Sequence, residues 1–178
     1  MRWIRLLSTL ILSKFKKKLK VTETVTSSFH VWITDIDVSI MNHASIMTVF
    51  ETGRLELMVR SNFFNVASKN KWYFPTQAIS VQYYRPLKLF QKAQLCTRIS
   101  FVDEKWIYVE QKIERNEKIV AACIVKNTVK KGREIVTNSE IIEALNIDSL
   151  PTNKYDLIKT YELENIQMDE KLVNNWDD

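Results

Sequence analysis

Residues 35–54 read DIDVSIMNHASIMTVFETGR and decide the fold. Acidic and amide side chains stand just before apolar residues that are spaced as on one face of a helix, which predicts a helix over residues 44–61. A carboxylate at this point faces the partly positive N-terminal end of the helix, which also suits a polarised carbonyl group. Gly53 falls in the middle of the predicted helix and costs about 1 kcal/mol relative to alanine. We therefore expect the helix to pass close to another backbone, such as that of a sheet, at Gly53.

Five strands are predicted around this helix, one before it and four after it. The strands after the helix are rich in β-branched and aromatic residues, and short polar links join the last three of them. The predicted strands are residues 21–33, 78–84, 91–102, 106–114 and 118–129. A strand, a long helix and an antiparallel sheet form an α+β pattern, in which the sheet wraps around the apolar helix. Such a sheet leaves an edge that a second copy of the chain can pair with, so we expect a dimer.

Charge divides the chain into three parts. A chain of 178 residues favours one domain plus extensions. Residues 1–20 carry seven bases and no acid, whereas residues 151–178 carry three bases and seven acids. We expect a basic amphipathic N-terminal arm over residues 1–20, a domain over 21–150 and an acidic tail over 151–178, with a short helix over 139–146 capped by Ser139. Because the basic charge lies on the arm, nucleic-acid binding is not expected.

The apolar run of the arm, residues 3–15, is too short for a membrane-spanning helix, which needs roughly 20 apolar residues. Arg5 interrupts the run, and the lysines at 16–18 follow it, which is the wrong order for a signal peptide. An amphipathic helix fits better. It either lies on a membrane with its lysines among anionic head groups or packs on the domain, with a weak signal anchor as the third alternative.

The cysteines and histidines do not indicate a metal site. Cys96 and Cys123 are the only cysteines, and we predict two reduced, buried thiols in a cytosolic protein, with a disulfide or a nucleophilic thiol as the alternatives. His30 and His43 are the only histidines, so no zinc site is expected. The expected location is the cytoplasm, with peripheral contact at the inner membrane surface if the arm binds lipid, and no cofactor is expected.

Four short motifs follow one another in a characteristic order. They are Asp35-Ile36-Asp37, Met41-Asn42-His43-Ala44, the pair Glu51 and Arg54, and Tyr84-Arg85-Pro86-Leu87. In this order the chain resembles the hot-dog-fold acyl-CoA thioesterases, the 4-hydroxybenzoyl-CoA thioesterase-like superfamily, over residues 22–146. The resemblance implies a hot-dog fold, in which an antiparallel sheet wraps around one long central helix.

The chain departs from the family pattern at the start of the helix. The family has Gly-His where Ser39-Ile40 stands before Met41, and the loop is one residue shorter. The second Asn of the family motif is His43 here, and the family's Tyr is Ile46. Fewer of the family's polar residues are therefore present at the start of the helix.

The resemblance also implies roles for individual residues. Asp37 is the candidate that attacks the thioester carbonyl or activates a water, and N–H groups around His43 to Ser45 are candidates for holding the oxyanion. The catalytic candidates are Asp37, His43, Asn42 and Glu51, and the substrate-binding candidates are Ala44, Ser45, Ile46, Arg85 and Lys88. Structural roles are the alternatives: helix capping for the candidates at the helix start, ion pairing with Arg54 for Glu51, packing in the core for Ile46, and solvation for Arg85 and Lys88.

Three functions are compatible with the sequence. The first is an acyl-CoA thioesterase that hydrolyses a fatty or aromatic acyl thioester to the free acid and coenzyme A. The second is a non-catalytic acyl-thioester-binding hot-dog protein with a degenerate active site, and the third is a structural or membrane-recruited dimer. The expected partners are acyl-CoA or another acyl thioester, and further copies of the chain in a homodimer or a dimer of dimers.

Overall fold

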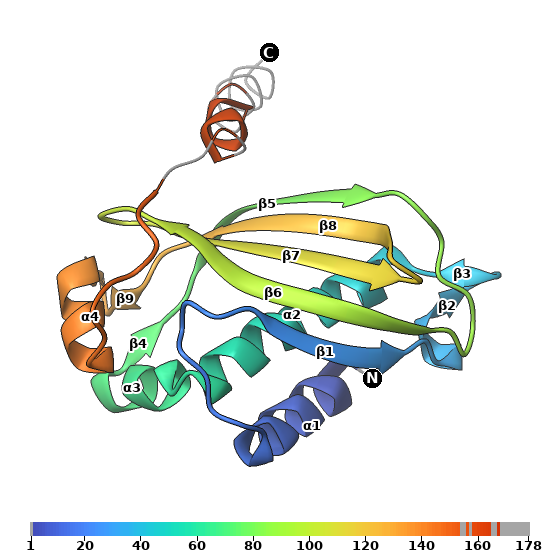
Figure 1. The fold of residues 1–178 in the computed structure, drawn as a ribbon, viewed down its shortest axis with the longest axis horizontal. Coiled ribbons are helices and arrows are strands. Elements are labelled where there is room, and N and C mark those ends of the chain that lie inside the picture. Colours follow the sequence, from blue (N-terminus) through green and yellow to red (C-terminus); the bar gives the residue numbers. More distant parts are fainter. Residues whose placement is uncertain (1, 154–155, 157, 165–166, 168–178) are drawn as a thin grey trace.

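In a computed structural model, which describes residues 2–153, 156, 158–164 and 167, a five-stranded sheet wraps around one long helix (Figure 1). The helix is α2 (His43–Arg60). The strands are all antiparallel and lie in the order β1-β6-β7-β8-β5, with bounds β1 (Val25–His30), β5 (Thr76–Tyr83), β6 (Lys92–Val102), β7 (Ile107–Arg115) and β8 (Lys118–Asn127). This is the α+β hot-dog fold that the sequence predicts.

Shorter elements complete the described part of the chain. They are α1 (Arg2–Phe15), η1 (Ile33–Asp35), β2 (Ile36–Asp37), β3 (Ile40–Met41), α3 (Phe63–Asn70), β4 (Trp72–Tyr73), β9 (Lys130–Lys131), β10 (Glu134–Ile135) and α4 (Asn138–Leu145). β2 and β3 form a hairpin, and β4, β9 and β10 form a small second sheet. Within the residues that the structure describes, no helix has the length and apolar character needed to cross a bilayer.

The sequence prediction differs from the structure at the first strand, at α3 and at the start of α4. The first strand covers residues 25–30 instead of 21–33, since the chain turns into η1 after Val31. Helix α3 is absent from the sequence prediction. The cap of α4 is Thr137 and not Ser139: the Thr137 hydroxyl accepts from the Glu140 N–H at 3.3 Å, and the Glu140 carboxylate accepts from the Thr137 N–H at 2.8 Å. This reciprocal capping box fixes the start of the helix one residue earlier than predicted.

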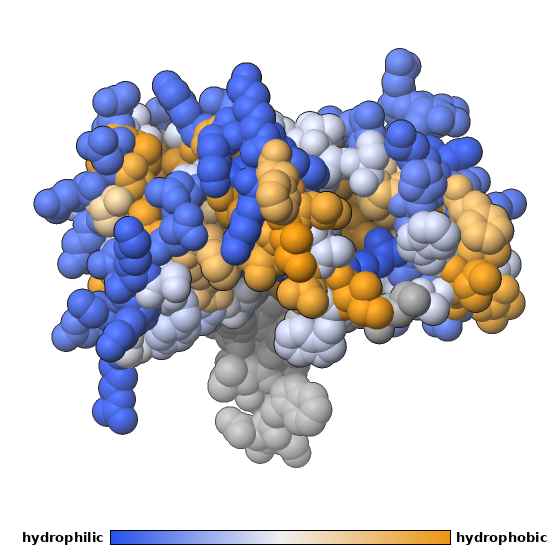
Figure 2. Space-filling view, turned by 90° about the horizontal axis from the view of Figure 1, so that it is seen from below, coloured by the Kyte–Doolittle hydropathy of each residue, from blue (hydrophilic) through white to orange (hydrophobic). Residues whose placement is uncertain are grey.

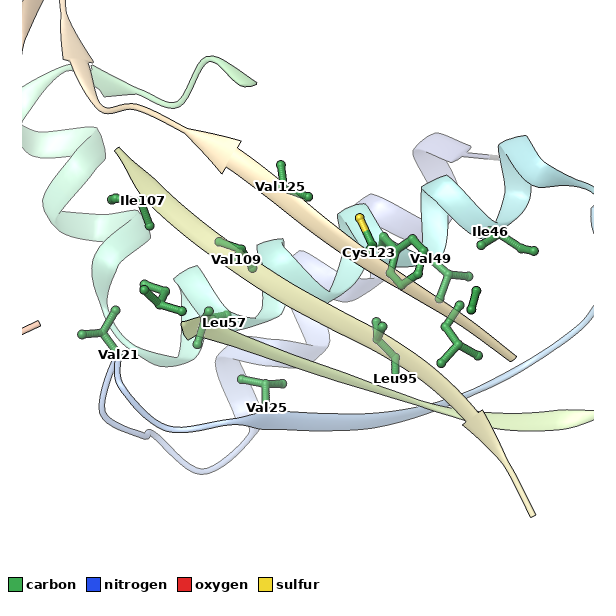
Figure 3. Packing of buried hydrophobic residues seen from close by; sticks show 14 of the residues in the cluster. Val21, Val25, Ile46, Val49, Leu57, Leu95, Ile107, Val109, Cys123 and Val125 are labelled. Atoms are coloured by element: carbon green, nitrogen blue, oxygen red, sulfur yellow. The ribbon is translucent and has the colours of Figure 1, made fainter. Parts of the chain in front are cut away.

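The hydrophobic core lies between α2 and the concave face of the sheet (Figure 3). Ile46, Val49 and Leu57 of α2 are each no more than 6% exposed and meet sheet residues such as Leu95 and Val125. Full burial of one such side chain contributes about 1.5–3 kcal/mol. The apolar stripe that predicts the helix is therefore the stripe that holds it in the sheet.

Gly53 lies where α2 comes closest to the sheet. A Cβ added at this position would lie 2.3 Å from Thr97 Oγ1 and 2.6 Å from Leu95 Cδ2. Contacts this short do not occur between real side chains, so the position has room for hydrogen alone. The predicted close approach to the sheet is confirmed, but the nearest groups are side chains of β6 and β7 and not the predicted backbone.

A β-bulge turns Phe101 away from this core. The register between β6 and β7 shifts between Ile99 and Phe101, and a shift of one residue moves a side chain to the opposite face. Phe101 instead joins a second cluster with Tyr108, Ile158 and Tyr161. Phe101 thus lies in a different cluster from Leu95 and Ile99 of the same strand. The last two members belong to the acidic tail, of which residues 154–155, 157, 165–166 and 168–178 lie outside the described residues.

Helix α1 packs against α2 through charged and small polar side chains. Glu56 of α2 is 3% exposed, and its Oε1 lies 2.9 Å from both Lys16 Nζ of α1's C-terminal flank and Arg60 Nη1. Ser13 is 1% exposed, and Arg5 forms an ion pair with Asp35. The predicted N-terminal arm is therefore a helix attached to the domain, with a charged contact near each of its ends.

Candidate active site

The β2–β3 hairpin carries Asp37. Asp37 pairs with Ile40, so Val38 and Ser39 form a two-residue turn. The Ser39 N–H donates to the Asp37 carbonyl oxygen at 2.6 Å, and Val38 adopts a left-handed conformation with φ of 56°. β-branched residues rarely adopt this conformation. The turn is tight, and the Asp37 side chain is exposed beside it.

Asp35 lies beneath the hairpin and holds both of its ends. Its side chain is 3% exposed, accepts from the Trp32 N–H at 2.9 Å and pairs with the Arg5 guanidinium. Its carbonyl oxygen accepts from the Asn42 N–H at 2.8 Å, so the start and the end of the hairpin are joined. Asp35 fixes the position of Asp37 without being exposed itself.

Asn42 is the single residue between β3 and α2, and it caps the helix. Its Oδ1 accepts from the Ser45 N–H at 2.7 Å. The first N–H groups of a helix have no partner inside it, so this bond satisfies one of them. His43 and Ala44 occupy the exposed first positions of α2, whereas Ile46 is 6% exposed and lies in the core. The N–H groups of His43 and Ala44 thus point out of the helix start, close in the chain to Asp37.

Glu51 is half-buried two turns further along α2. It lies eight residues after His43, which corresponds to about 12 Å along the helix axis. Within one chain, Glu51 is therefore separate from the helix start that follows the Asp37 hairpin. Its charge raises the pKa of Arg54, although burial has the larger effect and lowers that pKa overall.

Arg85 and Lys88 follow β5 in a segment that runs beside the hairpin. The Met41 N–H donates to the Leu87 carbonyl oxygen at 2.8 Å, which ties this segment to β3. Both basic side chains are exposed, and Arg85 Nη1 donates to the Ile119 carbonyl oxygen at 2.6 Å. The fold therefore brings the segment bearing both cations to the same end of the sheet as Asp37.

A buried polar network behind Gly53 is absent from the sequence prediction. Arg54 Nη1 donates to Gln111 Oε1 at 2.7 Å, and Gln111 Nε2 donates to the Phe50 carbonyl oxygen at 2.8 Å and to Thr97 Oγ1 at 2.9 Å. Burial raises the pKa of the nearby Cys123 thiol to about 11. The glycine in the middle of the helix was the feature of the sequence that could have indicated this network. A helix that passes close to a sheet brings polar groups of the two elements into direct contact.

A cavity at the sheet is lined in part by Thr97, Gln111 and Cys123, which belong to or lie near the polar network behind Gly53. It has a volume of about 710 Å³, and its lining includes Gln82, Cys96, Arg98, Lys112 and Tyr161. None of the candidate site residues lines it. Cys96 is half-buried there, which differs from its predicted full burial, and neither cysteine forms a disulfide. Among the described residues, no three His, Cys, Asp or Glu side chains are grouped so as to hold a metal ion.

Comparison with known proteins identifies the family. Residues 31–140 match the model of the thioesterase-like superfamily, and the chain belongs to this family. The matched segment contains the hairpin, all of α2 and the Arg85 segment. The sequence resemblance to thioesterases is thereby confirmed.

Three relatives illustrate the similarity. The chain is 30% identical to the probable thioesterase YBR096W of Saccharomyces cerevisiae over 78 residues, which is 43% of this chain and 34% of the yeast protein. It is 26% identical to protein THEM6 of Drosophila melanogaster over 134 residues, 74% of this chain and 66% of the fly protein. The chain thus spans less than two thirds of each of these proteins. The 1,4-dihydroxy-2-naphthoyl-CoA thioesterase of Synechocystis has the same fold, with a TM-score of 0.60, 12% identity and coverage of 69% of this chain and 95% of the other.

Proposed function

We propose that this protein is an acyl-CoA thioesterase that hydrolyses a fatty or aromatic acyl thioester. One observation carries the proposal: an exposed carboxylate, Asp37, stands on a hairpin that leads through a single capping residue into the start of α2. A thioester hydrolase needs a base or nucleophile beside donors for an oxyanion, and this hairpin and helix start supply both. Membership of the thioesterase-like superfamily and the aromatic acyl-CoA named for the Synechocystis enzyme support the choice of substrate.

In the proposed reaction, Asp37 accepts a proton from water while the water oxygen attacks the thioester carbonyl carbon. The negative charge that develops on the carbonyl oxygen is held by the N–H groups of His43 and Ala44, since that of Ser45 is already bonded to Asn42. The carbon–sulfur bond then breaks, and the proton passes to the thiolate of coenzyme A. Direct attack by the Asp37 carboxylate, followed by hydrolysis of the anhydride, leads to the same products.

Arg85 and Lys88 are proposed to bind the phosphates of coenzyme A. Their segment is tied to the hairpin through Leu87 and Met41, and both side chains are exposed. Ile46 and its apolar neighbours on α2 are proposed to line part of an acyl channel, since an acyl chain needs dry apolar surroundings. Glu51 is proposed to act across an interface between two copies, because it lies far from the helix start of its own chain.

A homodimer through the β5 edge completes the proposal. β5 pairs with β8 on one side, and in the described residues its other side forms the end of the sheet. Ile79, Tyr83 and Tyr84 in and beside this strand are 41%, 50% and 57% exposed. An exposed edge with large apolar side chains favours pairing with a second strand. We propose that two chains associate through residues 21–150 in the cytoplasm. Measurement of the particle mass in solution distinguishes this dimer from a dimer of dimers.

The test is release of coenzyme A from a panel of aromatic and fatty acyl-CoA substrates by the full chain. Asp37→Asn should lower kcat by about 100-fold or more, because a positioned acid or base contributes roughly 10²–10⁴-fold. Asp148→Asn, which changes an exposed aspartate after α4, is the matched control and should leave the rate unchanged. Unaltered turnover in Asp37→Asn, with the wild-type oligomeric state, would exclude Asp37 as the catalytic group.

A non-catalytic acyl-thioester-binding protein is the second candidate. It is favoured by the use of Asn42 as a helix cap, which removes one polar group from substrate contact. It predicts micromolar binding of a non-hydrolysable acyl-CoA analogue together with no release of coenzyme A from any member of the panel.

A further inference from the structure

Helix α1 faces the domain with three polar and two apolar side chains. The side chains of α1 that are buried or half-buried are Arg5, Leu6, Thr9, Leu10 and Ser13. Two charged contacts fix this side: Arg5 pairs with Asp35, and Lys16, just after the helix, pairs with Glu56 at 2.9 Å. The helix is thus held near both of its ends by ions of the opposite sign on the domain.

The opposite side of α1 is apolar and exposed. Trp3, Ile4, Leu7, Ile11 and Phe15 are 78%, 66%, 59%, 49% and 85% exposed. Their spacing of one, three and four residues places them on one face, and we call these five side chains the α1 stripe. Figure 2 views the molecule from the side on which α1 lies and shows an apolar band bordered by hydrophilic side chains. An amphipathic helix that turns its apolar face outward marks an interaction surface.

Basic side chains lie at the C-terminal end of the α1 stripe. Lys14, Lys17, Lys18 and Lys20 are all exposed, and residues 1–20 contain no acid. An apolar face with exposed lysines at one end and a tryptophan at the other matches a bilayer interface that carries anionic head groups. A partner protein would need an acidic rim around an apolar groove. An anionic membrane offers both acidic head groups and an apolar acyl region.

We propose that α1 docks the folded domain on an anionic lipid surface through the α1 stripe. The helix lies in the plane of the interface, remains attached to Asp35 and Glu56, and inserts its apolar side chains at the level of the head groups. This proposal does not depend on thioesterase activity.

The same arrangement brings the active-site hairpin close to the lipid. Asp35 joins Arg5 of α1 to the Trp32 N–H, and the adjacent Trp32 and Ile33 side chains are 55% and 70% exposed. These two exposed apolar side chains closely precede β2 in the chain. The hairpin that carries Asp37 therefore begins next to the point where Arg5 attaches α1 to the domain.

Vesicle co-sedimentation of the full chain tests the proposal. Vesicles of phosphatidylcholine with phosphatidylserine should bind the protein, and vesicles of phosphatidylcholine alone should bind it much less. The double variant Leu7→Glu, Ile11→Glu should weaken binding by about 100-fold or more, because two apolar side chains no longer enter the interface. Lys17→Ala with Lys18→Ala should weaken vesicle binding by roughly fivefold per lysine. Added salt should also weaken vesicle binding, because it screens the attraction to the anionic head groups.

Leu163→Glu is the matched control, because Leu163 is 62% exposed on the helical segment 158–164 and lies outside α1. It should bind vesicles as the wild type does, and all variants should keep the wild-type circular dichroism. Failure of the wild type to bind anionic vesicles would overturn the proposal, as would unchanged binding by the Leu7→Glu, Ile11→Glu variant. A smaller particle mass for this variant in light scattering, without loss of vesicle binding, would instead assign the stripe to contact between copies.

Discussion

The close packing at Gly53 leads to a quantitative prediction for Gly53→Ala. Alanine in a helix interior is favoured over glycine by about 1 kcal/mol. Against this gain, the new methyl group would lie 2.3 Å from Thr97 Oγ1, 2.6 Å from Leu95 Cδ2 and 2.9 Å from Gln111 Nε2. Overpacking of a core costs about 1–3 kcal/mol, and each buried polar group that loses its partner costs about 1–3 kcal/mol more. The variant should therefore lose about 2–4 kcal/mol of unfolding free energy.

Urea unfolding followed by circular dichroism measures this change, with every variant at the same protein concentration because a dimer's stability depends on it. Adding Thr97→Ala removes the nearest clashing atom, so the double variant should lose less than the sum of the single losses. Thr48→Ala in the same helix is the control and should stay within about 0.5 kcal/mol of the wild type. A Gly53→Ala protein as stable as the wild type, or more stable, would refute the packing argument.

Two further predictions concern the helix cap and the buried thiol. Asn42→Ala should cost about 1 kcal/mol in the same urea assay, while Asn42→Asp should cost only a few tenths, because aspartate caps equally well; equal losses would contradict the capping role. Burial raises the pKa of Cys123 to about 11, so little thiolate exists at pH 8 and iodoacetamide should label the half-buried Cys96 first. Labelling of Cys123, followed by mass spectrometry, should increase as the pH rises towards 11, and labelling at pH 8 as fast as that of Cys96 would be inconsistent with its burial.

The elements that the sequence predicts well are those with a repeating local pattern. The apolar spacing from Ile46 to Leu57 predicts α2, and alternation over residues 91–129 predicts the β6-β7-β8 meander, because these patterns reflect which side of each element is buried. Helix α3 lacks such a signal. It is eight residues long and contains Asn, Ser and Val, which have low helix propensity, and it follows Asn62 in a left-handed conformation.

Features that depend on distant pairs could not be predicted. Phe101 changes face because of a bulge whose position is set by the pairing of β6 with β7, not by its neighbours in the chain. Glu56 is buried because Lys16, 40 residues earlier, covers it. In the candidate site, the sequence predicts that Asp37 precedes the helix start. The link between Arg5 and Asp35, and the one between Leu87 and Met41, arise only when the chain has folded.

The segment that matches the thioesterase-like superfamily depends on a charged residue outside it. The match to the thioesterase-like superfamily begins at residue 31, whereas the cation that pairs with Asp35 comes from residue 5. Residues 31–140 alone would contain the Asp35 carboxylate without its counter-ion, at the base of the hairpin that carries Asp37. A boundary drawn by similarity would therefore remove part of the support of the candidate active site, and a fragment that keeps this support has to include helix α1 together with residues 21–150.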